Sequence, residues 1–250
     1  MVCERWMHPG WLSNSYLVAD REAGEGIIVD SGADPEPIVA AARTLRVKVL
    51  WIVNTHHHHD HTAGNEALRR ELGADVAVHV LEAALIPGVR RRLEDGEVLA
   101  AGDLEARVLH IPGHTAGQIA LLVRARSETP QRVFTGDTLF RRSVGGTKGP
   151  GHTTFEDLRR SLLERLLALP PETIVLPGHA SATTVGEERE HNPFVRVMRG
   201  IDAPVTASCR FAGRPARLIV WARDYDGGHK AWIRFEDGED AVVPGSGVSL

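Results

Sequence analysis

Short apolar runs rich in Val and Ile alternate along the first 200 residues with segments whose apolar residues recur at helical spacing. The apolar runs predict strands at 26–30, 47–54, 104–111, 119–123, 132–135 and 173–176. The helical spacing predicts helices at 34–45, 64–72, 154–169 and 185–190. Strands interleaved with helices indicate a layered α/β protein.

The helix predicted at 154–169 has the clearest ends. Thr153 or Thr154 can cap its first turn, and Pro170 followed by Pro171 ends it. Its apolar residues lie on one side, as in an amphipathic helix.

The pattern changes after about Gly200. From Arg217 to Pro244, β-type runs (LIVWAR, KAWIRF and DAVVP) are separated by Asp-Gly turns. We therefore expect a small β-rich module at 201–250, docked on a larger domain formed by 1–200. Its large aromatic residues are expected in its own core rather than on a binding face; they are Trp221, Trp232 and Phe235.

Composition narrows the class of protein. The 250 residues are 25% charged and 42% hydrophobic, as in an ordinary globular protein, and the net charge of −4 argues against nucleic-acid binding through bulk electrostatics. No apolar run approaches the ~18 residues that a membrane span needs. Cys3 and Cys209 are isolated, and the first five residues lack the pattern of a secretory signal. We expect a cytoplasmic protein with a small-molecule substrate and no nucleic-acid or membrane partner; whether it forms a homo-oligomer stays open.

The sequence HHHHDH at 56–61 is the most informative segment. It follows a predicted strand and precedes a predicted helix, and ligands of open α/β sheets bind at such strand ends. Residues two apart in an extended segment share a side, so His56 and His58 can bind one metal ion together, while His57 and His59 point away. Asp60 and the final His61 can face a second ion. Imidazole and carboxylate ligands suit zinc, iron or manganese.

Three further loops can complete two coordination shells. They are PGHT at 112–115, GDTLF at 136–140 and PGH at 177–179, and each follows or separates predicted strands. Each places one candidate ligand beside a glycine that permits a tight turn; these ligands are His114, Asp137 and His179.

In this order and roughly this spacing, the four motifs resemble the metallo-β-lactamase superfamily, and within it the glyoxalase II (hydroxyacylglutathione hydrolase) group, over about residues 12–196. The resemblance implies an αββα sandwich with two divalent metal ions at one edge, zinc first, with iron or manganese as alternatives. It also implies a ligand set in which Asp137 bridges site one (His56, His58 and His114) and site two (Asp60, His61 and His179).

Such a site is suited to acyl hydrolysis. Two zinc ions carry about +4, two aspartates about −2 and a metal-bridging hydroxide about −1, and the remaining charge of about +1 would stabilise an oxyanion on an attacked carbonyl. Metal binding lowers the pKa of water from ~15.7 to about 7, so the hydroxide exists at neutral pH. Asp60 would bind the second ion and orient this hydroxide. A thiolate leaves without a general acid, so the prediction is hydrolysis of a thioester such as S-lactoylglutathione or a relative.

Other interpretations stay open. Persulfide dioxygenases resemble this chain but use a single iron on two histidines and one aspartate, here His56 or its partner, His114 and Asp137; that interpretation leaves the second set of donors without a role. Lactonases and phosphodiesterases share the full ligand set. Zinc β-lactamases place a cysteine in the second site, where this chain has none. A non-enzymatic scaffold whose β module binds a partner is a further alternative.

The chain departs from the glyoxalase II pattern after GDTLF. That group continues with Gly-Cys-Gly and a basic residue that helps to hold the thiol, whereas this chain has RRSVGGTK at 141–148 and Gly146 at the basic position. The β module also replaces the helical C-terminal domain of longer members. The acyl group, thiol and native metal therefore stay open. Substitute substrate contacts are predicted at Arg141, Arg142, Lys148 and His152.

Overall fold

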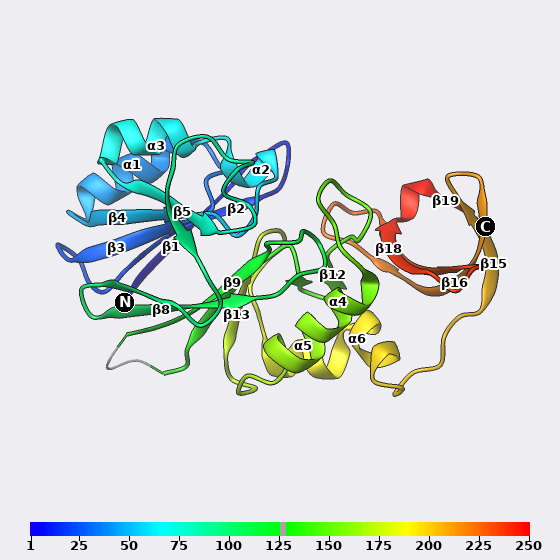
Figure 1. Cartoon of the computed structure of the whole chain (residues 1–250). Helices are drawn as coiled ribbons and strands as arrows, with labels where there is room; N and C mark the ends of the chain where they lie inside the picture. Colours follow the sequence, from blue (N-terminus) through cyan, green and yellow to red (C-terminus); the bar gives the residue numbers. More distant parts are fainter. Residues whose placement is uncertain (126–128) are drawn as a thin grey trace.

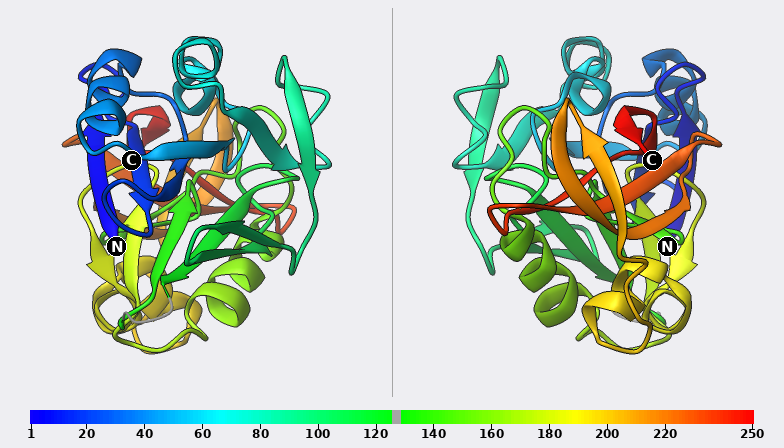
Figure 2. Two further views of the ribbon diagram at one scale, coloured as in Figure 1. Left: turned by 90° about the vertical axis from the view of Figure 1, so that its left-hand side faces the viewer. Right: turned by 90° about the vertical axis from the view of Figure 1, so that its right-hand side faces the viewer.

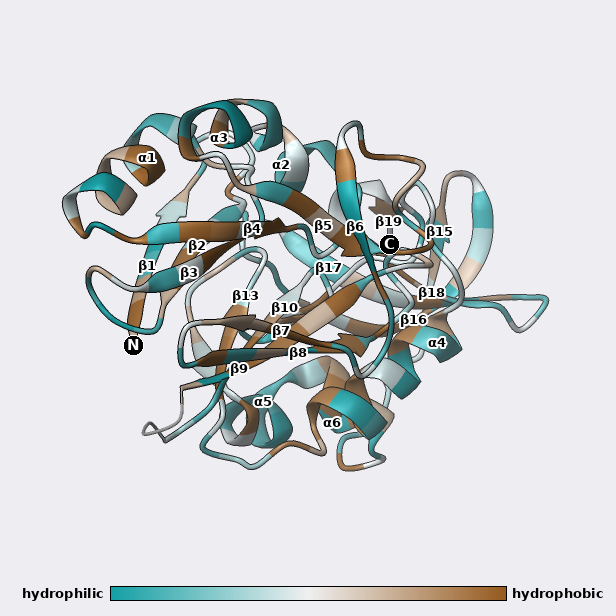
Figure 3. Cartoon of the chain, turned by 60° about the vertical axis from the view of Figure 1, so that its left-hand side comes forward, coloured by the Kyte–Doolittle hydropathy of each residue, from teal (hydrophilic) through white to brown (hydrophobic). Residues whose placement is uncertain are grey.

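The computed structural model describes residues 1–125 and 129–250, and within these it stacks two six-stranded sheets between two layers of helices (Figure 1). Hydrophobic residues concentrate on the strands, while the outer sides of the helices are mostly hydrophilic (Figure 3). This arrangement confirms the αββα sandwich that the resemblance implies. Among the described residues, no helix is long and apolar enough to cross a membrane.

The first sheet is antiparallel at one edge and parallel from its third strand onward. Helices α1 (Pro35–Thr44) and α3 (Asn65–Leu72) pack on its outer side through residues such as Ile38 and Leu68. Asp34 caps α1, and Gly73 ends α3 in a left-handed conformation with φ of 68°. The strands lie in sequence order: β1 (Val2–Met7), β2 (Asn14–Ala19), β3 (Glu25–Val29), β4 (Lys48–Val53), β5 (Asp75–His79) and β6 (Val89–Leu93).

The second sheet faces the first across a core that includes Tyr16, Leu121 and Phe134. Helices α4 (Phe155–Arg160), α5 (Val185–His191) and α6 (Pro193–Met198) cover its outer side (Figure 1). In spatial order its strands are β14 (Thr183–Thr184), β13 (Ile174–Pro177), β10 (Arg132–Gly136), β9 (Ile119–Ala125), β8 (Leu104–His110) and β7 (Val98–Ala101). A short pair, β11 (Leu139–Phe140) and β12 (Ser143–Val144), follows β10.

The helix predicted at 154–169 is regular only in its first half. Thr154 caps α4 in a capping box with Asp157, but the chain continues from Arg160 as a π-helix, η1 (Ser161–Leu166). The turns widen where Ser161 Oγ donates a hydrogen bond of 2.7 Å to Pro112 O in a loop of the second sheet. Apolar spacing does not distinguish these wider turns over six residues, so the sequence predicts an ordinary helix.

The C-terminal segment forms a five-stranded antiparallel sheet within the described residues (Figure 2, right). One side has its own core around Leu218, Ile233 and Phe235. The order is β18 (Asp240–Pro244), β17 (His229–Phe235), β16 (Arg214–Arg223), β15 (Ala207–Phe211) and β19 (Val248–Ser249), with a short 3-10 turn η2 (Gly245–Gly247) before β19.

The other side of this sheet joins the core around α4 and α6. Trp232 stacks on Phe155 with ring centroids 4.5 Å apart, so it lies in the shared core rather than in the core of the module alone. Phe235 lies in the module's own core as expected, and Trp221 is half-buried against His229. The division into 1–200 and 201–250 stays a prediction, because the shared core joins both parts.

Candidate metal centre

Four loops converge at one edge of the sandwich. The loop after β4 leads into a single turn, α2 (His59–Thr62), and the loop between β8 and β9 carries His114. Asp137 and His179 follow β10 and β13, which pair in parallel, so both residues leave the second sheet at the same edge. The convergence follows from strand direction, since parallel strands end on the same side.

Glycine is required at two positions beside the candidate ligands. Gly136 has φ of 45°, which favours glycine, and a Cβ there would lie 2.3 Å from Gln118 Nε2. At Gly178, a Cβ would lie 2.3 Å from Asp137 Oδ1 and 2.8 Å from His61 Cε1. A side chain at Gly178 would therefore fill the space between two candidate ligands.

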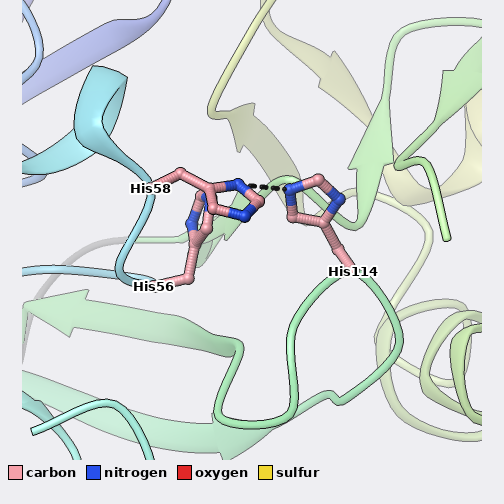
Figure 4. A group of neighbouring side chains, drawn as sticks. All are labelled: His56, His58 and His114. Carbon is pink, nitrogen blue, oxygen red and sulfur yellow. Dashed lines mark hydrogen bonds between the residues drawn. The ribbon is translucent and has the colours of Figure 1, made fainter. Parts of the chain in front are cut away.

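The structure brings all seven predicted ligands together. In the described part of the chain, their donor atoms form three groups, each within 4.8 Å: His56, His58 and His114; His56, His61 and Asp137; and Asp60, His61 and His179. Figure 4 shows the first group, in which His58 Nδ1 lies 3.0 Å from His114 Nε2. The groups share members, as neighbouring binding positions do.

Hydrogen bonds on the far side of the imidazoles determine which nitrogen faces the cluster. Nδ1 of His61 lies 2.9 Å from Asp30 Oδ2, and Nδ1 of His114 lies 2.8 Å from Gly146 O. Nδ1 of His56 lies 3.0 Å from Thr55 Oγ1. In all three residues, Nε2 is therefore left to face the cluster. Metal-binding histidines commonly have such a hydrogen-bond partner on their other nitrogen.

His58 has the opposite arrangement. Its Nε2 lies 2.9 Å from Pro150 O, which leaves Nδ1 facing His114. His58 therefore faces this group through Nδ1, whereas His56 and His114 face it through Nε2.

Asp30 is a residue in contact with the centre that the sequence analysis missed. It is buried directly after β3, and its carboxylate accepts hydrogen bonds from Thr55 N at 2.7 Å and Thr55 Oγ1 at 2.9 Å in addition to facing His61. The available signal was its position at the end of the strand predicted at 26–30, next to the strand that leads to the histidine run.

The donor set fits divalent cations. Three buried atoms that face the cluster have no hydrogen-bond partner in the part of the chain that the structure describes: Nε2 of His56, Nε2 of His61 and Oδ1 of Asp137. Buried polar atoms normally have partners, and a coordinated cation would satisfy inward-facing nitrogens and a carboxylate oxygen. Five imidazoles and two carboxylates, without a thiolate, suit zinc, iron or manganese.

Burial keeps two of the histidines in the neutral form that binds metals. It lowers the pKa of His114 to about 4 and, together with neighbouring His61, holds the pKa of His56 well below its ordinary value. Burial also acts to lower the pKa of the two other buried histidines of the centre, but neighbouring carboxylates outweigh it. Asp137 and Asp30 raise the pKa of His61, and Asp137 raises that of His179 to about 9.

The two carboxylates of the centre are anionic near neutral pH. Burial acts to raise the pKa of Asp137, but His179 and His61 hold it well below its ordinary value. Burial also acts to raise the pKa of Asp60, which contacts with His179 and His61 lower. The two carboxylates therefore offer anionic oxygens to an incoming cation, which would take the place of the protons on His61 and His179.

His57 and His59 lie outside the three donor groups. The His57 ring contacts Glu82, whose other oxygen accepts a hydrogen bond of 2.7 Å from Gly117 N. The His59 ring meets Trp11 edge-on at 5.2 Å. Both side chains thus point away from the cluster.

The predicted substrate contacts have partners on the protein surface. Lys148 forms an ion pair with Glu239, and Arg141 Nη1 lies 3.2 Å from Ser181 Oγ. Arg142 Nη2 lies 3.3 Å from Glu187 Oε2, and the exposed His152 Nδ1 lies 2.7 Å from Gly149 O. Their contact with a substrate stays a prediction.

Tyr225 is a second residue that the sequence analysis did not connect with the site. It lies in the turn between β16 and β17, and its ring stacks on His179 with centroids 4.3 Å apart and 13° between the planes. Burial and the carboxylates of Asp137, Asp224 and Asp60 raise the pKa of its phenol. The Asp226-Gly227 turn was predicted, but no local pattern indicates where that turn lies.

Comparison with known proteins adds a family match. Residues 8–179 match the model of the Metallo-beta-lactamase superfamily. A hydroxyacylglutathione hydrolase of Rhodospirillum rubrum is 38% identical over 165 residues, which are 66% of this chain and 60% of that enzyme. The chain therefore matches about three fifths of the length of this relative.

Two solved structures have the same fold over most of this chain. ETHE1 from Myxococcus xanthus gives a TM-score of 0.69 at 28% identity, covering 82% of this chain and 93% of that one. TTHA1623 in a di-iron-bound form gives 0.65 at 35% identity, covering 76% of this chain and 99% of that one.

Proposed function

Because the chain belongs to the metallo-β-lactamase superfamily, we propose that it is a hydrolase that holds two metal ions and cleaves thioesters. The position of Asp137 carries this proposal. Its Oδ1 lies 3.3 Å from His61 Nε2, and its Oδ2 lies 3.5 Å from His114 Nε2 and 3.4 Å from His179 Nε2. One carboxylate thus reaches both sets of imidazoles, as a bridging ligand must.

The donors divide into two binding positions joined by Asp137. Site one would be held by His56, His58 and His114, and site two by Asp60, His61 and His179. Zinc is the first candidate, and the likeness to a di-iron protein keeps iron in consideration.

Bound divalent ions would lower the pKa of water to about 7 and stabilise negative charge on an attacked carbonyl oxygen. Asp60 is the more exposed carboxylate, with 27% of its side chain accessible against 10% for Asp137. Its contacts with His61 and His179 both use Oδ2, so Oδ1 is available to accept a hydrogen bond from the attacking water and orient it.

The proposed reaction adds one water across the acyl–sulfur bond and yields a carboxylate, a thiol and one proton. A thiolate is a good leaving group, so the reaction needs no residue to protonate the sulfur. The likeness to a hydroxyacylglutathione hydrolase favours a thioester over the lactone and phosphodiester substrates that the same donors could serve.

A persulfide dioxygenase is the second candidate, because ETHE1 from Myxococcus xanthus shares the fold at 28% identity. A single iron would need only His56, His114 and Asp137. The buried His61 and His179, which also face Asp137, favour the binuclear hydrolase.

Metal analysis and a substrate panel test the proposal. We expect close to two metal ions per chain and hydrolysis of S-lactoylglutathione or another thioester, in a panel that includes lactones and bis(p-nitrophenyl) phosphate. Thioester rates near background would refute the thioesterase. A single iron, with oxygen consumed in the presence of glutathione persulfide, would establish the dioxygenase instead.

A further inference from the structure

The hairpin between β16 and β17 reaches from the C-terminal sheet to the metal centre. The Tyr225 ring in its turn stacks on His179 at 4.3 Å and meets Phe140 edge-on at 5.4 Å. Phe140 belongs to the same loop region as Asp137, so Tyr225 contacts two of the four converging loops. The segment that matches the family ends at residue 179, before this hairpin begins.

A hydrogen bond to the buried Asp224 attaches the hairpin to β12, and an ion pair within the hairpin fixes that carboxylate. Asp224 Oδ2 lies 3.0 Å from Lys230 Nζ, with both side chains less than 10% exposed, and Asp224 Oδ1 accepts a hydrogen bond of 2.8 Å from Ser143 Oγ. Moving the hairpin away would take the Ser143 donor from this buried carboxylate, so the contact resists displacement.

A second attachment joins β18 to the segment after β12, in which Gly146 O faces Nδ1 of His114. Thr147 N donates to Val242 O, and Val242 N donates to Thr147 Oγ1, both at 2.9 Å. The hairpin therefore presents Tyr225 at a defined place.

The Tyr225 hydroxyl has no hydrogen-bond partner within residues 1–125 and 129–250, although its ring is half-buried. A phenol that packs inside a protein normally has one, but this hydroxyl is still open to solvent and so to a bound molecule. The other tyrosine of the chain shows the usual case: Tyr16 is buried, and its hydroxyl donates to Pro177 O at 2.8 Å. An unpartnered donor beside a candidate metal ligand is suited to an oxygen atom of a bound molecule.

We propose that Tyr225 is a substrate-binding residue whose hydroxyl donates a hydrogen bond to an oxygen of the substrate's acyl group. The C-terminal sheet then completes the active site and contributes to its specificity. This inference rests on the proposed acyl hydrolysis. It assigns a role to a residue outside the segment shared with the family.

The test is Tyr225→Phe, which keeps the ring on His179 and removes only the hydroxyl. We expect kcat/KM for the best thioester to fall by about 10–100-fold, as for loss of a hydrogen bond to an atom that carries charge in the transition state. Metal content and Tm should match those of the wild type. Because the substrate is held less well, KM should rise as well.

Trp221→Phe is the matched control. It changes an aromatic residue of β16 that stacks on His229 instead of on a metal-centre loop, and kcat/KM should stay within about twofold of wild type. A Tyr225→Phe variant with the wild-type kcat/KM would overturn the inference while leaving the thioesterase intact.

If the wild-type protein hydrolyses no thioester, the proposed function fails and a binding measurement decides on Tyr225. Inorganic phosphate is titrated into the cobalt-loaded full-length protein and followed by the visible absorption of the metal. We expect at least about tenfold weaker phosphate binding in Tyr225→Phe, since a phosphate oxygen would lose the same donor. Equal affinities would overturn the inference.

Discussion

Replacing Asp30 with Asn would disturb the imidazoles of both proposed metal positions. Asp30 Oδ2 faces His61 Nδ1 and accepts from Thr55 Oγ1, each at 2.9 Å. The same Thr55 Oγ1 lies 3.0 Å from His56 Nδ1. Since the Thr55 hydroxyl donates to Asp30, it accepts from His56, and both histidines carry their proton on Nδ1. One carboxylate thus keeps two Nε2 atoms free to bind metal.

An Asn side chain cannot replace both oxygens. If its amide nitrogen takes the place of Oδ2, it faces two donors, and His61 must move its proton to Nε2, the atom expected to bind metal. If the nitrogen instead takes the place of Oδ1, it faces the backbone N–H of Thr55. In the native protein this N–H donates a hydrogen bond of 2.7 Å to Oδ1. That buried amide is then unsatisfied at a cost of about 1–3 kcal/mol.

The expected loss follows from these two orientations. Removing a partner behind a metal-binding imidazole typically weakens metal binding by about 10–100-fold, which is about 1.4–2.8 kcal/mol. We expect this loss in Asp30→Asn at both positions. The free energy of unfolding of the metal-free protein should also fall by about 1–3 kcal/mol.

Competition with a chromophoric chelator measures the metal affinities, and urea unfolding measures the stability of the metal-free protein. Asp20→Asn is the control. Asp20 is also buried and accepts from the backbone N–H groups of Arg21 at 2.8 Å and Glu25 at 3.0 Å, but it follows the end of β2 opposite to the metal centre. The Asp20→Asn variant should be less stable than the wild type and should bind metal ions with the wild-type affinity. Wild-type metal affinity in Asp30→Asn would refute the reasoning.

Three further predictions concern the bridge, the shared core and a buried carboxylate. Asp137→Ala should lose metal and turnover, measured by metal analysis and thioester assay; full activity would contradict the bridging role. Trp232→Ala should lower the free energy of unfolding by about 3–5 kcal/mol, because it leaves a cavity against Phe155, and a loss below about 1 kcal/mol in urea would contradict the shared core. Burial acts to raise the pKa of Glu82, but its contact with His57 lowers it. Its folded pKa is therefore below the unfolded one, and the stability that it contributes above about pH 4.3 is lost in acid. The stability difference between wild type and Glu82→Gln should thus be largest near pH 7 and shrink in acid; a constant difference would count against a stabilising Glu82 carboxylate.

The helices and strands that local apolar spacing indicates were predictable from the sequence. The strands at 104–111 and 119–123 and the helix at 34–45 appear within a few residues as β8, β9 and α1. Burial on one side imposes a period of two on a strand and 3.6 on a helix, and that period is present in the sequence itself. The π-helical turns after Arg160 escaped prediction, because apolar spacing over six residues does not distinguish them from an α-helix.

The sequence by itself determined the donor types and their loops. Histidine and aspartate beside glycine, each after an apolar run, are sufficient to indicate the chemistry of a metal centre. Only the tertiary structure decided that Asp30 orients two imidazoles and that Tyr225 lies on His179. Such contacts join residues far apart in the chain. They depend on how sheets pair and pack, and that packing leaves no repeating pattern around either residue.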